Sequence, residues 1–146
     1  MPRNIGRIKR TGEDELSREI GNQYERLAQQ YFESIGLIFM ASNVVVNGGE
    51  VDLLMQSEVD IEGELRMGEL CIIEVKGRKV KSDWTDEVVS LRKAKRWRLA
   101  AQHVLWRLED GEWSIPLAMT GIQFVLVRIE GQMIEVNWNA TDLDLG

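Results

Sequence analysis

The chain has 146 residues, of which 44% are hydrophobic and 29% are charged, and its net charge is −6. This length and composition predict one globular domain and exclude a disordered or fibrous chain. The single cysteine, Cys71, and the single histidine, His103, exclude an internal disulfide and a Cys/His metal cluster. No stretch approaches the ~20 apolar residues of a membrane span, and no apolar region follows the basic N-terminus. We therefore expect a cytoplasmic protein without membrane contact.

Charge is unevenly distributed along the chain. Residues 49–74 carry eight acidic residues and one basic residue, whereas residues 75–108 carry ten basic and three acidic residues. Two solvated faces of opposite sign would produce this pattern. A carboxylate cluster beside a phosphate-binding surface would also produce it, so charge alone leaves both interpretations open.

The first part of the chain predicts an arm, a helix and a hairpin. Residues 1–15 are polar and have no apolar period, which favours a flexible basic arm. Apolar residues recur at steps of three and four over 16–35, which predicts a helix. Two β-rich runs follow at 37–46 and 50–55, and the Asn-Gly-Gly between them is a turn signal.

The second part of the chain predicts three more strands and a second helix. Residues 57–68 are charged and contain glycine, which indicates a loop or hairpin tip. The apolar run 70–75 predicts a central strand that is buried on both faces. A helix is expected over 88–108, and strands are expected over 122–129 and 133–138. The predicted order is therefore helix, three strands, helix, two strands.

Acidic residues and a lysine gather near the ends of two predicted strands. Glu74 and Lys76 are two residues apart at the end of the central strand, so their side chains leave the same face. Asp52 and Glu50 share a face of the preceding strand, which pairing would bring close. Carboxylate oxygens bind Mg²⁺ or Mn²⁺, and such an ion can clamp a phosphodiester and activate water. A neighbouring lysine can orient that water and stabilise developing charge.

The two predicted helices add further candidates. Glu25 borders the apolar stripe of the first helix, so a helix packed on the sheet would place it over the same site. Lys93 falls inside the apolar arc of the second helix, which is an unusual place for a lysine. Basic residues after the central strand and on the second helix would contact phosphates: Arg78, Lys79, Lys81, Arg92, Lys95 and Arg96.

Each of these residues also has an ordinary interpretation without chemistry. Glu74 and Lys76 would form an exposed pair where the strand leaves the core. Glu50 and Asp52 would serve the turn that precedes them, and Glu25 would be a solvated helix flank. The lysine inside the apolar arc would extend its ammonium to the surface, and the basic cluster would be a solvated face.

Three segments resemble the YraN-like proteins, which are small bacterial proteins predicted to be endonucleases: IGNQYERLAQQYFESIGL, ASNVVVNGGEVDLLM and LCIIEVKGRK. This family is similar to archaeal Holliday-junction resolvases and to the wider PD-(D/E)xK nuclease superfamily. The resemblance implies an α/β, restriction-endonuclease-like fold, in which two main helices flank a central mixed sheet of about five strands. We therefore expect a single nuclease-like domain over 16–140, followed by a C-terminal tail at 141–146.

The resemblance implies roles for individual residues. Asp52 and Glu74 match the metal-binding acids, Lys76 matches the lysine of the ExK motif, and Glu25 matches a helix acid that helps to hold the metal. Accessory positions of less settled role are Glu50 and Lys93. The chain departs from the family pattern in a longer, acidic segment at 57–68. It also lacks an arginine and an aspartate at 123–126 and an arginine at 44–46.

The resemblance implies Mg²⁺-dependent or Mn²⁺-dependent phosphodiester hydrolysis on DNA by an endonuclease-like protein, with selectivity for DNA structure left open. A second interpretation is a non-catalytic nucleic-acid-binding or assembly module on the same fold. A third, which the charge of −6 favours, is a protein-interaction domain. Resolvase-like relatives often act as dimers because a junction has two-fold symmetry, so a homodimer is also expected as a candidate assembly.

Overall fold

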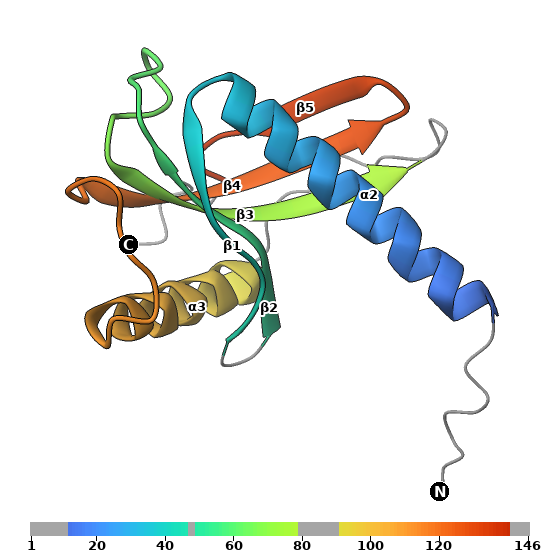
Figure 1. Cartoon of the computed structure of the whole chain (residues 1–146), viewed down its shortest axis with the longest axis horizontal. Coiled ribbons are helices and arrows are strands. Elements are labelled where there is room, and N and C mark those ends of the chain that lie inside the picture. The colour runs from blue at the N-terminus through green and yellow to red at the C-terminus, as the bar shows by residue number, and fades with distance from the viewer. Residues whose placement is uncertain (1–11, 47–48, 79–90, 141–146) are drawn as a thin grey trace, which may run out of the picture.

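Five strands form one mixed sheet, and a helix packs on each of its two faces (Figure 1). The computed structural model describes residues 12–46, 49–78 and 91–140, and predictions for the other residues lie outside it. The elements in chain order are α2 (Gly12–Ser34), β1 (Leu37–Val46), β2 (Gly49–Ser57), β3 (Glu69–Arg78), α3 (Leu91–Glu109), β4 (Gly121–Glu130) and β5 (Met133–Asn137).

The strands lie in the order β1-β2-β3-β4-β5. Neighbouring strands pair antiparallel except β3 and β4, which are parallel and are connected through α3. This arrangement confirms the expected α/β architecture with a central mixed sheet and two main helices. No helix in the described part of the chain combines the length and the apolar character that crossing a membrane requires.

Strand β3 contacts both helices, as its continuous apolar sequence predicts. Ile73 belongs to the buried cluster that contains Phe32 of α2, whereas Ile72 belongs to the cluster that contains Val104 of α3. Successive side chains of a strand point to opposite faces, so a strand covered on both sides must be apolar on both. The two helices therefore cover opposite faces of the sheet.

One boundary differs from the sequence-based expectation, and the hairpin tip predicted at 57–68 is confirmed. Helix α2 begins at Gly12 rather than near residue 16, because a first helical turn can form without an apolar stripe. Residues 57–68 form an ordered hairpin tip, closed by a bridge between Ile61 and Leu65. Beside this tip, the fully buried Gln56 exchanges two hydrogen bonds with the backbone of Leu117, at 2.8 and 3.0 Å.

A close approach between α2 and β3 depends on Gly77. A Cβ atom at this position would overlap the ring of Tyr24, so only glycine lets the helix lie this near the strand. Glu25 follows Tyr24 in the same helix. The contact between Tyr24 and Gly77 therefore fixes how far Glu25 stands from the end of β3.

We predict that Gly77→Ala destabilises the fold by about 1–3 kcal/mol, the usual cost of overpacking a well-packed contact. Tyr24→Ala should relieve the overlap, so the double variant should lose less stability than the sum of the single losses. Chemical denaturation of the variants measures this. Gly49→Ala is the control, because nothing lies within 4 Å of its added Cβ. Additive losses would contradict the assigned contact.

Candidate functional site

The divergence of β2 from β3 positions Asp52. Pairing between the two strands ends at Leu53 and Ile73, and Asp52 and Glu74 are the next residues of each strand. The Val75 amide donates a hydrogen bond to Oδ2 of Asp52 at 2.8 Å. A side-chain oxygen thus takes the place of a backbone acceptor where the two strands separate. The Asp52 carboxylate is therefore held between the strands beside Glu74.

Burial and neighbouring carboxylates raise the pKa of Asp52. Burial is the largest cause, and the negative charges of Glu74 and Glu50 add to it. The hydrogen bond from Val75 and the positive charge of Lys76 act in the opposite direction. Glu50 and Glu74 therefore lie near enough to Asp52 for their charges to act on its carboxyl group.

Glu25 joins these acidic residues from α2. Its pKa is raised first by burial and then by the negative charges of Asp52 and Glu50, while a hydrogen bond with the Asn43 side chain lowers it. The structure therefore brings the helix acid to the same end of the sheet as Asp52. A cation at this end would reduce the repulsion among the carboxylates.

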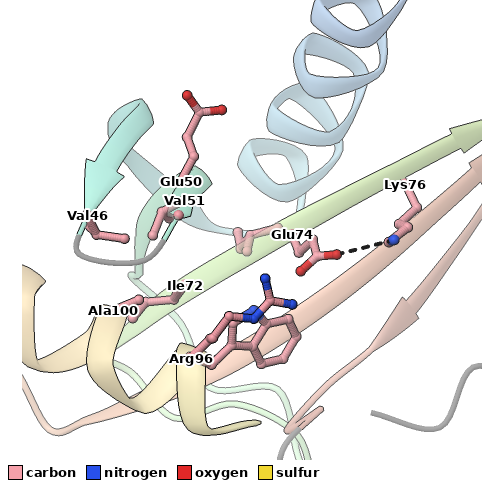
Figure 2. Close-up of a pocket in the computed structure, with 11 residues that line it drawn as sticks. Val46, Glu50, Val51, Ile72, Glu74, Lys76, Arg96 and Ala100 are labelled. Carbon is pink, nitrogen blue, oxygen red and sulfur yellow. Dashed lines mark ion pairs between the residues drawn. The ribbon is translucent and has the colours of Figure 1, made fainter. Parts of the chain in front are cut away.

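Glu74 and Lys76 lie on one face of β3, as their spacing predicts. They continue the alternation of Ile72, so both lie on the side of the sheet that α3 covers. The Lys76 Nζ atom is 3.6 Å from Oε2 of Glu74, and Figure 2 shows this ion pair. Both side chains are partly exposed, and an ion pair of this kind adds little stability. The ion pair therefore contributes little to the stability of the fold.

A pocket of about 230 Å³ lies beside the ion pair, between α3 and the end of the β1–β2 hairpin. Figure 2 shows Arg96 extending from α3 toward Glu74, whereas the Glu50 carboxylate points away from the ion pair. Within the lining, Trp97 stacks on Phe124 with ring centroids 5.4 Å apart. Buried apolar residues also line the pocket: Val46, Val51, Ile72 and Ala100.

The remaining predicted basic residues are placed only in part. Lys95 is exposed on α3 and does not line the pocket. Three more lie on described backbone, but their side chains are outside the described part of the structure: Arg78, Arg92 and Lys93. Lys79 and Lys81 lie outside the described residues altogether.

Sequence reasoning gave no role to Asn43, which the structure places at the site. Its φ of 51° is in the left-handed region, and it lies in β1 across from Asp52. Asparagine adopts this conformation more readily than most residues. An asparagine directly before three valines was therefore the one sequence feature that could have indicated an irregular position in β1. The hydrogen bond between Asn43 and Glu25 links β1 to α2.

The donor atoms of this site fit a hard divalent cation. Among the described residues, no group of three or more Asp, Glu, His or Cys side chains is placed to hold a metal ion. Mg²⁺ commonly takes one or two carboxylates and completes its shell with water and substrate phosphate. Asp52 and Glu74 supply carboxylate oxygens of this kind. They would hold Mg²⁺ or Mn²⁺ with oxygens from the substrate.

The only thiol of the chain, that of Cys71, is not placed to act as a nucleophile. Cys71, the one cysteine of the chain, is buried, and burial raises the pKa of its thiol to about 12. A nucleophilic cysteine needs a thiolate and access to substrate. Cys71 has neither, because it points into the core between β3 and α2.

Comparison with known proteins identifies a family match over most of the chain. The model of the uncharacterised protein family UPF0102 matches residues 24–129. A UPF0102 protein of Vibrio vulnificus is 32% identical over 129 residues, which cover 88% of this chain and 95% of the relative. A UPF0102 protein of Yersinia pseudotuberculosis is 33% identical over 130 residues, which cover 87% and 97%. The matched range contains every acidic residue of the site.

We predict that Asp52→Asn makes the fold more stable than the wild type at pH 7. The folded state raises the pKa of Asp52, so the ionised carboxylate destabilises the fold. This penalty grows as the pH rises from the ordinary pKa of an aspartate to the raised pKa of the folded state, and it is fully present above that value. Asparagine removes the charge and keeps an oxygen to accept the Val75 hydrogen bond. Denaturant unfolding at pH 7 and at pH 4, close to the ordinary pKa of an aspartate, should show a gain that shrinks at the lower pH.

Glu62→Gln is the control for this experiment, because Glu62 is exposed on the hairpin tip. It should not reproduce the pH-dependent gain. An Asp52→Asn variant that is no more stable than the wild type at pH 7 would contradict the prediction, because it would show that the ionised Asp52 carboxylate does not destabilise the fold.

Proposed function

Since this chain belongs to the uncharacterised protein family UPF0102, we propose its activity from the site: metal-dependent hydrolysis of phosphodiester bonds in DNA. The observation that carries the proposal is the grouping of Asp52, Glu74 and Lys76 where β2 separates from β3. The similarity of the motifs to the PD-(D/E)xK nucleases supports it. We place the protein in the cytoplasm, where a free buried thiol is favoured and DNA is accessible.

Each residue of the site has a distinct task in this proposal. Asp52 and Glu74 hold the divalent ion, and Glu25 adds negative charge from α2 at the same end of the sheet. When bound, the ion supplies positive charge at the scissile phosphate. The hydrogen bond from Val75 fixes the orientation of Asp52, so the carboxylate need not reorganise when the substrate arrives. The Lys76 ammonium orients the attacking water and stabilises charge that develops on the phosphate.

Positive charge near the site supports a nucleic-acid partner despite the net charge of −6. Arg96 lines the same pocket as Glu74 and Lys76, so a phosphate beside the ion pair would lie within reach of its guanidinium. Arginine binds phosphate through two parallel hydrogen bonds. The carboxylates would repel DNA without a metal, which makes the ion necessary for close binding as well as for chemistry.

We predict that Lys76→Ala lowers DNA cleavage by about 10²–10³, the effect of losing one preorganised electrostatic group. Metal and DNA binding should remain, because the carboxylates hold the ion and Arg96 binds phosphate. Lys76→Arg should restore cleavage only in part, since a planar fork does not replace a compact ammonium. Glu74→Ala should remove both metal binding and cleavage. Cleavage assays and metal titration calorimetry measure these effects, with Arg66→Ala as the control.

The substrates should include duplex, flap, single-stranded and four-way-junction DNA, each with Mg²⁺ and with Mn²⁺. Wild-type protein that binds DNA but yields no product on any of them would reject the nuclease. That outcome would identify a non-catalytic nucleic-acid-binding module. A chain that binds neither DNA nor metal would instead be a protein-interaction domain.

We predict that Arg96→Ala reduces the salt dependence of DNA binding. Loss of one phosphate contact should lower the slope of log affinity against log salt by about 0.9 on duplex DNA. Fluorescence anisotropy at several salt concentrations measures the slope, with a non-cleaving Lys76→Ala background in both proteins. Arg66→Ala, on the distant hairpin tip, should leave the slope unchanged. An unaltered slope in the Arg96 variant would remove Arg96 from the interface.

A further inference from the structure

Five exposed side chains form a straight stripe along α3: Lys95, Leu99, Gln102, Trp106 and Glu109. Their spacing of four, three, four and three residues is that of a coiled-coil seam, in which one side of a helix faces a partner. Leu99 is 51% exposed and Trp106 is 57% exposed. Large apolar side chains at seam positions indicate a contact surface rather than a solvated face.

The opposite side of α3 already packs against the sheet. Ala100, Ala101 and Val104 belong to the buried cluster beneath the helix, and α3 runs along an outer side of the molecule (Figure 1). The stripe is therefore not part of the core. It lies on the side of α3 that faces away from the sheet, where a second molecule can approach.

A groove beside the stripe extends this surface onto β1. The groove has a volume of about 360 Å³ and lies between α3 and the end of β1, where Val45 is 69% exposed. Arg107 ties its two sides together, because Nη1 donates a hydrogen bond to the Val45 carbonyl at 2.7 Å. The groove is thus built into the fold, and its volume leaves room for part of a large side chain.

We infer that the stripe on α3 joins two copies of this chain, with their helices antiparallel about a two-fold axis at Gln102. In this register Lys95 faces Glu109 of the partner subunit, and Leu99 faces Trp106 of the partner subunit. Gln102 meets Gln102 of the partner subunit on the axis. The groove next to Val45 then receives the indole of the partner's Trp106.

The order of the residues in the stripe indicates that its partner is a second copy of the same chain. Read in either direction, the stripe offers a charged end, an apolar residue, an amide, an apolar residue and an oppositely charged end. A two-fold contact is isologous, so each position must suit its own counterpart in reverse order. The antiparallel register pairs opposite charges and apolar residues. A parallel register would place like charges together.

The extent of the surface sets the strength of the contact. The stripe is about 21 Å long at 1.5 Å per helical residue. One helix pair of this length covers less than the ~800 Å² per partner that stable complexes bury. We therefore expect a dimer that dissociates on dilution. Lys95 serves this contact, whereas its neighbour Arg96 lies in the pocket beside Glu74.

Sedimentation velocity over a range of protein concentrations, without DNA or added metal, tests the inference independently of any nuclease activity. The wild type should shift from monomer to dimer as concentration rises. Trp106→Glu should be monomeric throughout, because it places a charge in the apolar part of the seam. Met133→Glu is the matched control, since Met133 is 71% exposed on β5, away from α3, and this variant should dimerise like the wild type.

A charge exchange tests the register. Lys95→Glu and Glu109→Lys should each weaken the dimer several-fold, because each places like charges opposite one another twice in a two-fold contact. The double variant K95E/E109K should recover the affinity of the wild type. A monomeric wild type at every concentration would overturn the inference. So would identical behaviour of the Trp106 and Met133 variants, or a double variant no tighter than the single variants.

Discussion

The hydrogen bond from the Val75 amide to the Asp52 carboxylate is the interaction on which the site depends. This hydrogen bond lies where the pairing of β2 with β3 ends. It links the two strands beyond their last paired residues and also fixes the position of the Asp52 carboxylate. A charged acceptor makes this bond stronger than a neutral backbone pair. The separation of the strands beyond it leaves room for Glu25 and Glu74 to approach Asp52 from opposite faces of the sheet.

The carboxylates are held together against their mutual repulsion by the packing around them. Apolar clusters on both faces of the sheet fix β2 and β3, and the close contact of Tyr24 with Gly77 fixes α2. Burial raises the pKa of both Asp52 and Glu25, so ionisation of these two carboxyl groups opposes folding. Strain of this kind is typical of sites that are preorganised for a ligand.

Local patterns in the sequence predicted the strands and the shared face of Glu74 and Lys76. The run predicted over 37–46 is strand β1, because a turn signal limits it on one side and a glycine on the other. Contacts between segments that are far apart in the sequence could not be predicted from these local patterns. The bond of Asn43 to Glu25 depends on where α2 lies, and that of Gln56 to Leu117 joins residues 61 positions apart. No period or motif reports such distances.

The parallel pairing of β3 with β4 has a consequence for synthesis of the chain. The three strands β1, β2 and β3 can pair through short connections, but the ladder from Glu69–Gly121 to Arg78–Glu130 must wait until α3 and β4 have been made. Domains emerge from the ribosome N-terminal part first. All four acidic residues of the site thus leave the ribosome while one edge of β3 still lacks its partner. That apolar edge is a template for wrong pairing until β4 docks, and long-range parallel pairing of this kind forms slowly.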